Sequence, residues 1–241
     1  MMRSTLRRAG AAASACAVLA GVIACGSDED ECGAGGSCPA SFGPTATAAP
    51  GTGAVVNDPA RLSAGLLAAT DLPGDFSVVP PRGEPTDPAV PPVAPTDPPD
   101  CARLLTPIAS QRPGSSAAAS VQFAGPSFAT IDIDAASYPD ASLAGAFDAL
   151  QDRPRRCVSY TGEDEGVRID YRTAPLDQPK AGDAHSAFTL TAASEGLTLT
   201  SATALVQVGN TLVQIVVTAP EVVDPGVLAD LTAAQVRKLR A

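Results

Sequence analysis

The stretch ALVQVGNTLVQIVV, residues 204–217, decides the fold, because it places Gly209-Asn210 between two runs rich in β-branched residues. Glycine at the first position of such a two-residue loop is typical of a type II′ β-hairpin. The loop sets the cross-strand pairs, which are Val208 with Thr211, Val206 with Val213, and Ala204 with Ile215. Apolar side chains then meet on one face, so the register agrees with the hydrophobic pattern.

The strand before this hairpin carries its apolar residues in the opposite parity. Leu197 and Leu199 are out of phase with Val206 and Val208. A β-bulge between Thr200 and Ala204 would restore one common face. The same bulge would bring Phe188 and Leu190 onto that face.

Three segments have the start signals and periodicity of helices. Asp58-Pro59 is an N-cap followed by proline at the first helical position, and the helix it opens ends near Thr70. A second helix begins at Asp140 and ends before Pro154, and Asp224-Pro225 opens a third. Their apolar positions are Leu62 and Leu66, then Leu143, Phe147 and Leu150, then Leu228, Leu231 and Leu239.

Shorter stretches alternate apolar and polar residues, as half-buried strands do. They are residues 76–79, ATIDID at 129–134 and VRIDYR at 167–172. Together with the hairpin they give about six strands, the last three consecutive, and three main helices in residues 57–241. We therefore predict a single α+β domain, with a mostly antiparallel sheet and helices packed on one face.

A proline-rich segment interrupts this domain at residues 80–100, where nine of 21 residues are proline. We expect an extended surface loop of polyproline character rather than regular structure. A docking segment of the kind bound by SH3-like domains is the alternative reading.

The N-terminal residues have the organisation of a bacterial lipoprotein signal. Arg3, Arg7 and Arg8 precede an uncharged run, residues 9–24, of about 16 residues, shorter than the roughly 20 apolar residues of a spanning helix. The run ends in Val22-Ile23-Ala24-Cys25, which resembles a lipobox. We predict a signal peptide at 1–24 and Cys25 as the lipidated N-terminus, held in the membrane by acyl chains such as palmitate. The alternatives are a secretory signal cleaved elsewhere and an uncleaved anchor.

The composition fits an exported domain. The net charge is −10, and loss of the leader removes three arginines and no acid, leaving a mature chain at −13. Such a charge repels phosphates, so we expect no nucleic-acid partner. Residues 25–56 are rich in small residues and proline, and we expect a disordered tether there between the lipidated cysteine and the domain.

Four cysteines remain once Cys16 leaves with the leader and Cys25 is lipidated. In an oxidising compartment an even number favours disulfides. Only GAGGS separates Cys32 from Cys38, so we predict that these two pair locally and that Cys101 pairs with Cys157. A zinc site is the alternative, but the CxxC spacing and a nearby histidine are missing from the sequence, and we expect no metal.

A set of short motifs resembles a known family. LLAATDLPGDF (66–76) is followed by CARLL (101–105), by Tyr138-Pro139 before a helix containing AFDAL (146–150), and by Cys157. VQVGNTLVQIVV (206–217) and a terminal helix complete the set.

The pattern resembles the extracellular sensor domain of mycobacterial PknH-type kinases and the free-standing actinobacterial lipoproteins built on that domain. The resemblance covers residues 57–241. It implies a disulfide-braced antiparallel sheet with a surface cleft for an unknown ligand. Members typically carry two disulfides in the domain, whereas this chain offers one.

The sequence contains little that could carry catalysis. His185 is the only histidine, and neither a G-x-S-x-G nor an S-x-x-K motif is present. Asp132 and Asp134 share one strand face and could act as paired acids or hold Ca²⁺, although alternating acids usually form a solvated face. We therefore predict no catalytic residues and no cofactor.

Four further features could contribute to binding. Arg155-Arg156 form a compact basic pair that could meet an anionic ligand or simply be solvated, and Tyr138, Tyr160 or Tyr171 could border a pocket. The sequence assigns no ligand-binding residue and no oligomeric state. We predict a non-enzymatic, membrane-anchored lipoprotein whose domain binds a small molecule or envelope component. The alternative is a docking protein that uses its sheet edge or proline-rich loop.

Overall fold

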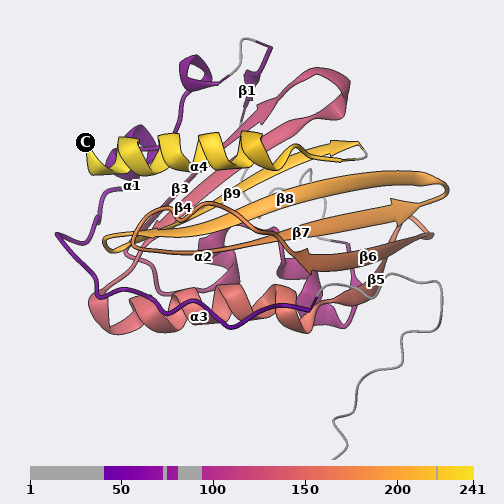
Figure 1. The fold of residues 1–241 in the computed structure, drawn as a ribbon, viewed down its shortest axis with the longest axis horizontal. Coiled ribbons are helices and arrows are strands. Elements are labelled where there is room, and N and C mark those ends of the chain that lie inside the picture. The colour runs from indigo at the N-terminus through magenta and orange to yellow at the C-terminus, as the bar shows by residue number, and fades with distance from the viewer. Residues whose placement is uncertain (1–40, 73–74, 81–93, 221) are drawn as a thin grey trace, which may run out of the picture. The chain divides into compact units, whose positions relative to one another are not determined.

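The computed structural model describes residues 41–72, 75–80, 94–220 and 222–241, and within them nine strands form one antiparallel sheet (Figure 1). The strand order is β1-β3-β4-β9-β8-β7-β6-β5-β2. Four α-helices and three short 3-10 turns accompany the sheet in the same residues. The strands are β1 (Ser77–Val79), β2 (Thr96–Asp97), β3 (Ala117–Ala124), β4 (Thr130–Ser137), β5 (Ser159–Asp164), β6 (Val167–Pro175), β7 (Ala184–Ser194), β8 (Leu197–Val208) and β9 (Thr211–Pro220). The helices are α1 (Pro59–Ala64), α2 (Ile108–Gln111), α3 (Asp140–Arg156) and α4 (Pro225–Arg240), and the 3-10 turns are Ala69–Asp71, Pro99–Arg103 and Pro126–Phe128. The predicted α+β fold with an antiparallel sheet is confirmed.

The β8–β9 hairpin lies at the centre of the sheet and has the predicted register. Val208 faces Thr211, Val206 faces Val213 and Ala204 faces Ile215. Gly209 has φ 58, the conformation that the first residue of a type II′ turn requires and that glycine adopts without steric penalty.

The predicted bulge in β8 is wrong. The β7–β8 ladder runs without interruption from Ala184 opposite Gln207 to Ser194 opposite Leu197. Leu197, Leu199 and Phe188 therefore lie on the face opposite to Val206. Phe188 is buried on that face, whereas Leu197 and Leu199 are exposed at the start of β8, so their parity is not that of a buried surface.

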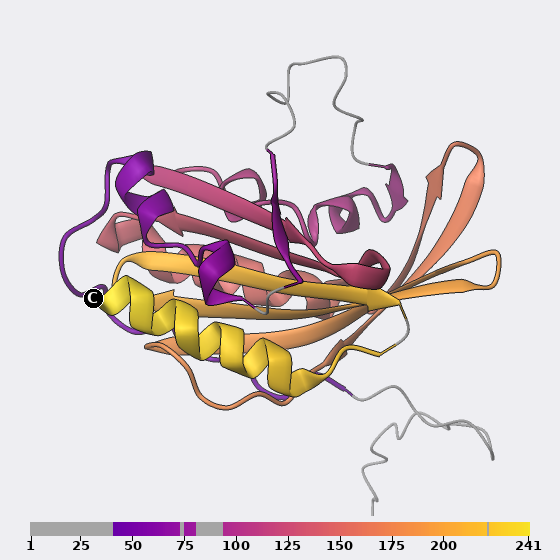
Figure 2. The ribbon, with the colours of Figure 1, turned by 90° about the horizontal axis from the view of Figure 1, so that it is seen from above.

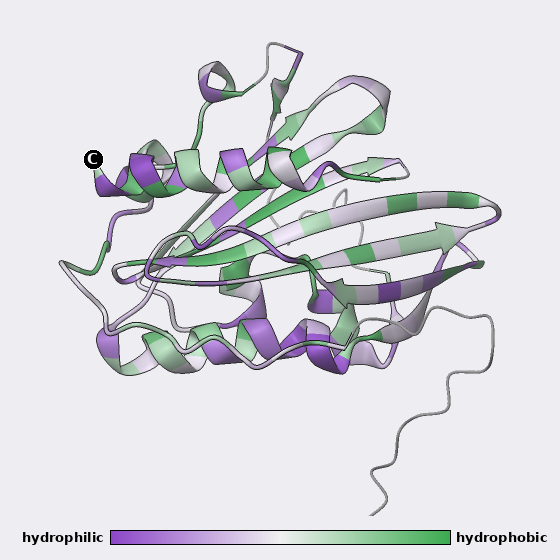
Figure 3. Ribbon diagram, viewed as in Figure 1, coloured by the Kyte–Doolittle hydropathy of each residue, from purple (hydrophilic) through white to green (hydrophobic). Residues whose placement is uncertain are grey.

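Helices cover both faces of the sheet, and the prediction of one covered face is wrong in this respect (Figures 1 and 2). On the first face, α4 and α1 pack on side chains such as Ile131, Val213 and Ile215. On the second face, α3 packs on Leu205 and Leu212. The alternation of polar and apolar residues along α3 in Figure 3 is typical of a helix with one buried side.

The helix boundaries differ from the prediction at two places. Asp58 caps α1 through a 2.9 Å bond from the Ala60 amide, but the helix ends at Ala64 rather than near Thr70. Helix α3 continues through Pro154 to Arg156. Pro154 has no amide hydrogen to donate to the carbonyl four residues earlier, so the last turn of α3 lacks one helical hydrogen bond. The Thr173 hydroxyl donates to the Pro154 carbonyl at 2.8 Å.

Residues 42–56 form an extended strap along the outside of α3, seen in indigo in Figure 1. Two buried glutamines hold its backbone. The Gln151 side chain accepts from the Ala46 amide at 2.9 Å and donates to the Ala46 carbonyl at 2.7 Å. Gln207 makes the same pair of bonds with Ala49, at 2.9 and 2.8 Å. Each side-chain amide thus makes the pair of hydrogen bonds that the backbone of a neighbouring strand would otherwise make with the strap.

The strap passes the β8–β9 turn at very short range. A Cβ atom on Gly51 would lie 2.7 Å from the Asn210 and Asp140 side chains, and one on Gly209 would lie 2.6 Å from the Thr52 carbonyl. Farther along, the Val56 amide donates to the Ser137 hydroxyl at 2.9 Å. The expected disordered tether is therefore wrong for residues 41–56, which belong to the folded domain.

Several predicted segments lie wholly or partly outside the described residues. These are the signal peptide at 1–24, Cys25, Cys32 and Cys38, and residues 81–93 of the proline-rich segment. The rest of that segment is partly regular, because Thr96–Asp97 pairs with β5 and a 3-10 turn spans Pro99–Arg103. No helix in the described ranges is both long and apolar enough to cross a bilayer.

Candidate functional site

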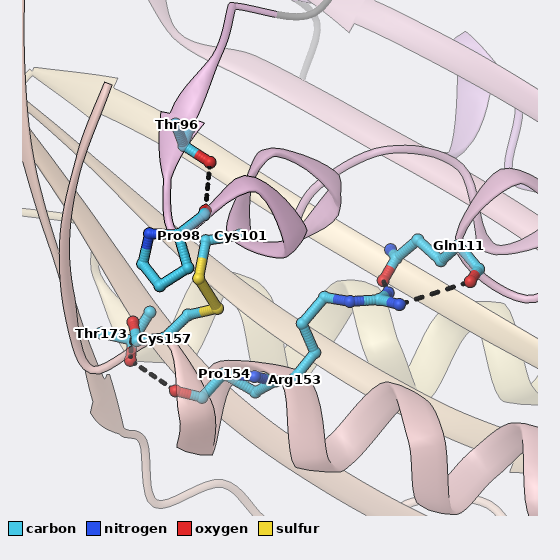
Figure 4. The surroundings of a disulfide bond; sticks show 8 residues. All are labelled: Thr96, Pro98, Cys101, Gln111, Arg153, Pro154, Cys157 and Thr173. Carbon is cyan, nitrogen blue, oxygen red and sulfur yellow. Dashed lines mark hydrogen bonds between the residues drawn. A yellow bond between two sulfur atoms is a disulfide. The ribbon is translucent and has the colours of Figure 1, made fainter.

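The Cys101–Cys157 disulfide is formed as predicted, and it joins the second 3-10 turn to the end of α3 (Figure 4). Both cysteines are buried in a cluster with Leu104, Tyr160 and Phe188. The Thr173 hydroxyl donates to the Cys157 carbonyl at 3.1 Å. The bond therefore fixes the segment before β3 onto the α3 face of the sheet.

A buried polar network lies beside this disulfide, with Asp134 of β4 at its centre. The Asp134 carboxylate accepts from the Ile108 amide at 2.6 Å, at the first residue of α2, and from the Gln214 side chain at 3.2 Å. Gln111 donates to Gln214 at 3.0 Å. Asp134 is therefore a structural group that holds α2 on the sheet. It was expected on a solvated face, but α2 covers it.

Arg153 of α3 extends the network toward the disulfide (Figure 4). Its guanidinium donates to the Gln111 side chain at 2.5 Å and to the Gln111 carbonyl at 3.3 Å. Burial lowers the pKa of Arg153, and the nearby charges of Arg103 and Arg156 lower it further. Within the described residues, the arginine thus joins α2 to α3 through hydrogen bonds to a neutral glutamine.

Asp132 occupies a more open position on the same face of β4. It accepts from the Gln122 side chain at 2.6 Å and from the Thr130 hydroxyl at 3.1 Å. Burial raises the pKa of Asp132 and, more strongly, that of Asp134, to about 7. In the described residues no third His, Cys, Asp or Glu joins the two carboxyls to form a metal-binding group.

The raised pKa of Asp134 predicts a specific pH dependence of stability. Between its ordinary pKa of 3.8 and about 7, the folded state holds a proton that the unfolded state releases. Stability from this group is thus fully present below about pH 4 and is lost as the pH rises through 7, by roughly 2–4 kcal/mol. Asp134→Asn should remove this slope, measured by urea unfolding at pH 4.5 and 7.5. Asp230→Asn, an exposed site on α4, should keep it, and equal slopes in Asp134→Asn and wild type would contradict the assignment.

His185 lies on the other face of the sheet, beside a small cavity of about 40 Å³ under α4. The cavity is lined by Lys180, Ala204, Thr232 and their neighbours. A volume of this size holds about one water molecule. His185 pairs with Val206 across the ladder, whereas Asp132 and Asp134 belong to the α3 face. The structure therefore separates the histidine from the two acids.

The three tyrosines have different surroundings. Tyr138 is buried, and its hydroxyl donates to the Arg112 carbonyl at 2.6 Å. Burial raises the pKa of Tyr138 to about 12. Tyr160 and Tyr171 stack with ring centroids 4.7 Å apart, and burial raises the pKa of each. Of the three, Tyr171 is the half-buried one that faces an open part of the sheet.

One arginine of the basic pair beside Cys157 is engaged in contacts within the domain. Arg155 donates to the Gly43 and Pro44 carbonyls at 2.5 and 3.2 Å, and its guanidinium lies 5.2 Å from the centroid of the Phe42 ring. Arg155 therefore fastens the start of the strap. No local sequence pattern indicates this role, or those of Gln151 and Gln207, because these side chains bind backbone atoms of a distant segment.

The α3 face of the sheet has an open stretch beyond α3 and α2. The register places five half-buried side chains there, in adjacent cross-strand rows. We call this group the open stretch: Thr130, Asp132, Thr218, Ala192 and Tyr171. It offers hydroxyl and carboxylate groups on β4 and β9 and an aromatic ring on β6, all on one face of the sheet.

The comparisons with known proteins concern the fold. Neither a family model nor a curated protein matches the chain. Among solved structures, the extracellular domain of PknH from Mycobacterium tuberculosis matches with a TM-score of 0.51 and 16% identity, over 78% of this chain and 98% of that one. An uncharacterized protein (Rv0999 ortholog) from Mycobacterium smegmatis matches with a TM-score of 0.39 and 18% identity, over 71% and 93%. The chain therefore shares the fold of the PknH extracellular domain, as the sequence motifs predicted.

Proposed function

We propose that this chain is a lipoprotein, anchored through Cys25 on the extracytoplasmic face of a bacterial membrane, whose domain binds a small molecule or envelope component. The open stretch is the observation that carries the binding proposal. A buried disulfide supports an oxidising compartment. The shared fold with an extracellular domain supports the same location.

The arrangement of ionisable groups supports binding rather than catalysis. General acid–base chemistry needs a base and a partner within hydrogen-bond reach of one substrate. His185 lies on the α4 face, and Asp132 and Asp134 lie on the α3 face. Both carboxylates already accept hydrogen bonds from protein donors.

One experiment tests the anchor and the ligand together. The full chain, expressed in an actinobacterial host, should partition into the detergent phase, and native mass spectrometry should show an adduct of defined mass. Thr218→Arg should abolish the adduct, because it fills the open stretch. Cys25→Ala should move the protein to the aqueous phase and keep the adduct.

His185→Ala is the matched control, because His185 lies on the opposite face and the adduct should be unchanged. Loss of the adduct in His185→Ala with retention in Thr218→Arg would refute the open stretch. A Cys25→Ala protein that stayed in the detergent phase would refute the anchor. A chain without any adduct would favour a docking function.

A docking protein that uses its sheet edge or the proline-rich segment 80–100 is the rival proposal. The two outermost strands in the described residues are β1, with three residues, and β2, with two. Short edge strands leave little backbone for a partner strand to pair with. Loss of co-purifying protein after deletion of residues 80–100 would favour this rival.

A further inference from the structure

Large exposed apolar side chains gather at one end of the sheet. The β3–β4, β5–β6 and β7–β8 turns and the β9–α4 connection all lie at this end (Figure 1). We call four residues there the apolar tip: Phe128, Leu197, Leu199 and Val222, with exposed fractions of 87, 76, 44 and 85%. They come from the β3–β4 connection, the start of β8 and the β9–α4 connection.

The register brings these connections together. Thr130, two residues after Phe128, pairs with Thr218 of β9, and Leu199 pairs with Pro220 at the end of the same strand. Val222 lies two residues after the end of that strand. In Figure 3 the end of β8 at this tip is green, although no helix lies over it. An exposed apolar group of this kind marks an interaction site more often than singly scattered residues do.

Phe128 is held in its exposed position by a strained loop. Ser127 and Phe128 have φ values of 53 and 63, in the left-handed region that bulky residues avoid. The loop is closed by hydrogen bonds from the Gly125 amide to the Ala129 carbonyl at 2.8 Å and from the Ala129 amide to the Pro126 carbonyl at 3.0 Å. A fixed backbone at Phe128 reduces the conformational entropy that this aromatic residue would lose on binding.

Acidic residues flank the apolar tip on one side, toward β7, β6 and β5, and form an acidic rim there. Glu163, Asp164 and Glu165 lie on the β5–β6 hairpin, and Glu195 lies in the β7–β8 turn, all exposed. None of these four carboxylates forms an ion pair within the described part of the chain, and the nearby Arg168 is paired with Asp170 at 2.9 Å. The rim of the tip is therefore negative.

We propose that the apolar tip docks on a partner protein that offers an apolar pocket bordered by lysine or arginine side chains. The acidic rim argues against two other occupants of the apolar tip, a lipid bilayer and a second copy of this chain. An anionic bilayer surface would repel it. A second copy would bring one acidic rim against another, which is unfavourable in a symmetric contact.

Photo-crosslinking of the full chain in intact actinobacterial cells tests this proposal. A benzophenone amino acid at Phe128 or Leu197 should give a discrete crosslinked protein, at least ten times more than at Val158, which is also exposed but lies outside the tip. Charge reversal by Glu195→Lys with Glu165→Lys should reduce the crosslink from Phe128 at least tenfold. The thermal midpoint of each variant serves as the folding control.

Four results would overturn the proposal. They are equal crosslinking at Val158, a crosslink unaffected by charge reversal, crosslinks to lipid alone, and crosslinked dimers of the chain itself. Vesicles of phosphatidylglycerol and phosphatidylethanolamine mixed with Cys25→Ala protein check the lipid result, because tip-dependent vesicle binding would assign the surface to the bilayer. The ligand adduct at the open stretch is measured separately, so the two proposals fail independently.

Discussion

Replacing Cys101 and Cys157 together by alanine should lower the free energy of unfolding by about 4 kcal/mol. The bond joins residues 56 positions apart and thereby restricts a large part of the unfolded chain. It is also buried in an apolar cluster, so reduction leaves two thiols in place without opening the core. Because small domains are stable by only about 5–15 kcal/mol, the loss is a large fraction of the total. Guanidinium unfolding under oxidising conditions measures it directly.

Two controls separate the crosslink from the side-chain change. Wild-type protein unfolded with a reducing agent should lose a similar amount, because it keeps both sulfur atoms and lacks only the bond. Cys25→Ala should unfold as the wild type does under oxidising conditions. A double variant within about 1 kcal/mol of wild type would show that the bond contributes little to stability.

Gln207→Leu should detach the middle of the strap. The substitution removes both bonds to the Ala49 backbone and also the 3.1 Å bond that Gln207 donates to the Gly209 carbonyl. Loss of these bonds at a fully buried side chain should destabilise the bound strap by about 2 kcal/mol. Hydrogen exchange at the Ala49 amide should then accelerate about 30-fold. Limited proteolysis within residues 42–56 should increase in parallel.

The matched control for this prediction is Gln178→Leu. Gln178 also donates to a backbone carbonyl, that of Pro225 at 3.1 Å, but the bond is exposed and distant from the strap. Exchange at Ala49 should be unchanged in this variant. If Gln207→Leu left the protection of Ala49 intact, the strap would be held by its remaining contacts, and the glutamine would not be its main attachment.

The parts of the fold that local sequence could predict are those with local causes. The Gly209-Asn210 turn, the Asp58 cap and the Asp224 cap each depend on neighbouring residues, and each is present. The disulfide followed from the number and spacing of cysteines. In contrast, β3 has the sequence AAASVQFA, in which small residues hide the alternation of a strand.

The predictions that were wrong concern residues whose surroundings depend on packing between segments distant in the sequence. The opposite parities along β8 looked like a register defect, whereas the ladder is regular and Leu197 and Leu199 lie exposed at its end, on the face opposite to α4. Asp134 looked solvated because nothing in ATIDID shows that α2 covers it. The strap looked disordered because its small residues bury little surface, and the glutamines that hold it lie over a hundred residues away. The open stretch and the apolar tip likewise exist only once the strands are aligned.

The strap also determines how a mechanical load would enter the domain. A pull on its N-terminal end meets Phe42 and Arg155 first, then Gln151, then Gln207, and reaches α1 only after Val56. If the strap were pulled perpendicular to α3, these attachments would break one after another. If it were pulled parallel to α3, in shear geometry, they would bear the load together. The strap would thus distribute a force on the N-terminus over α3, β8 and β4 before that force reaches α1.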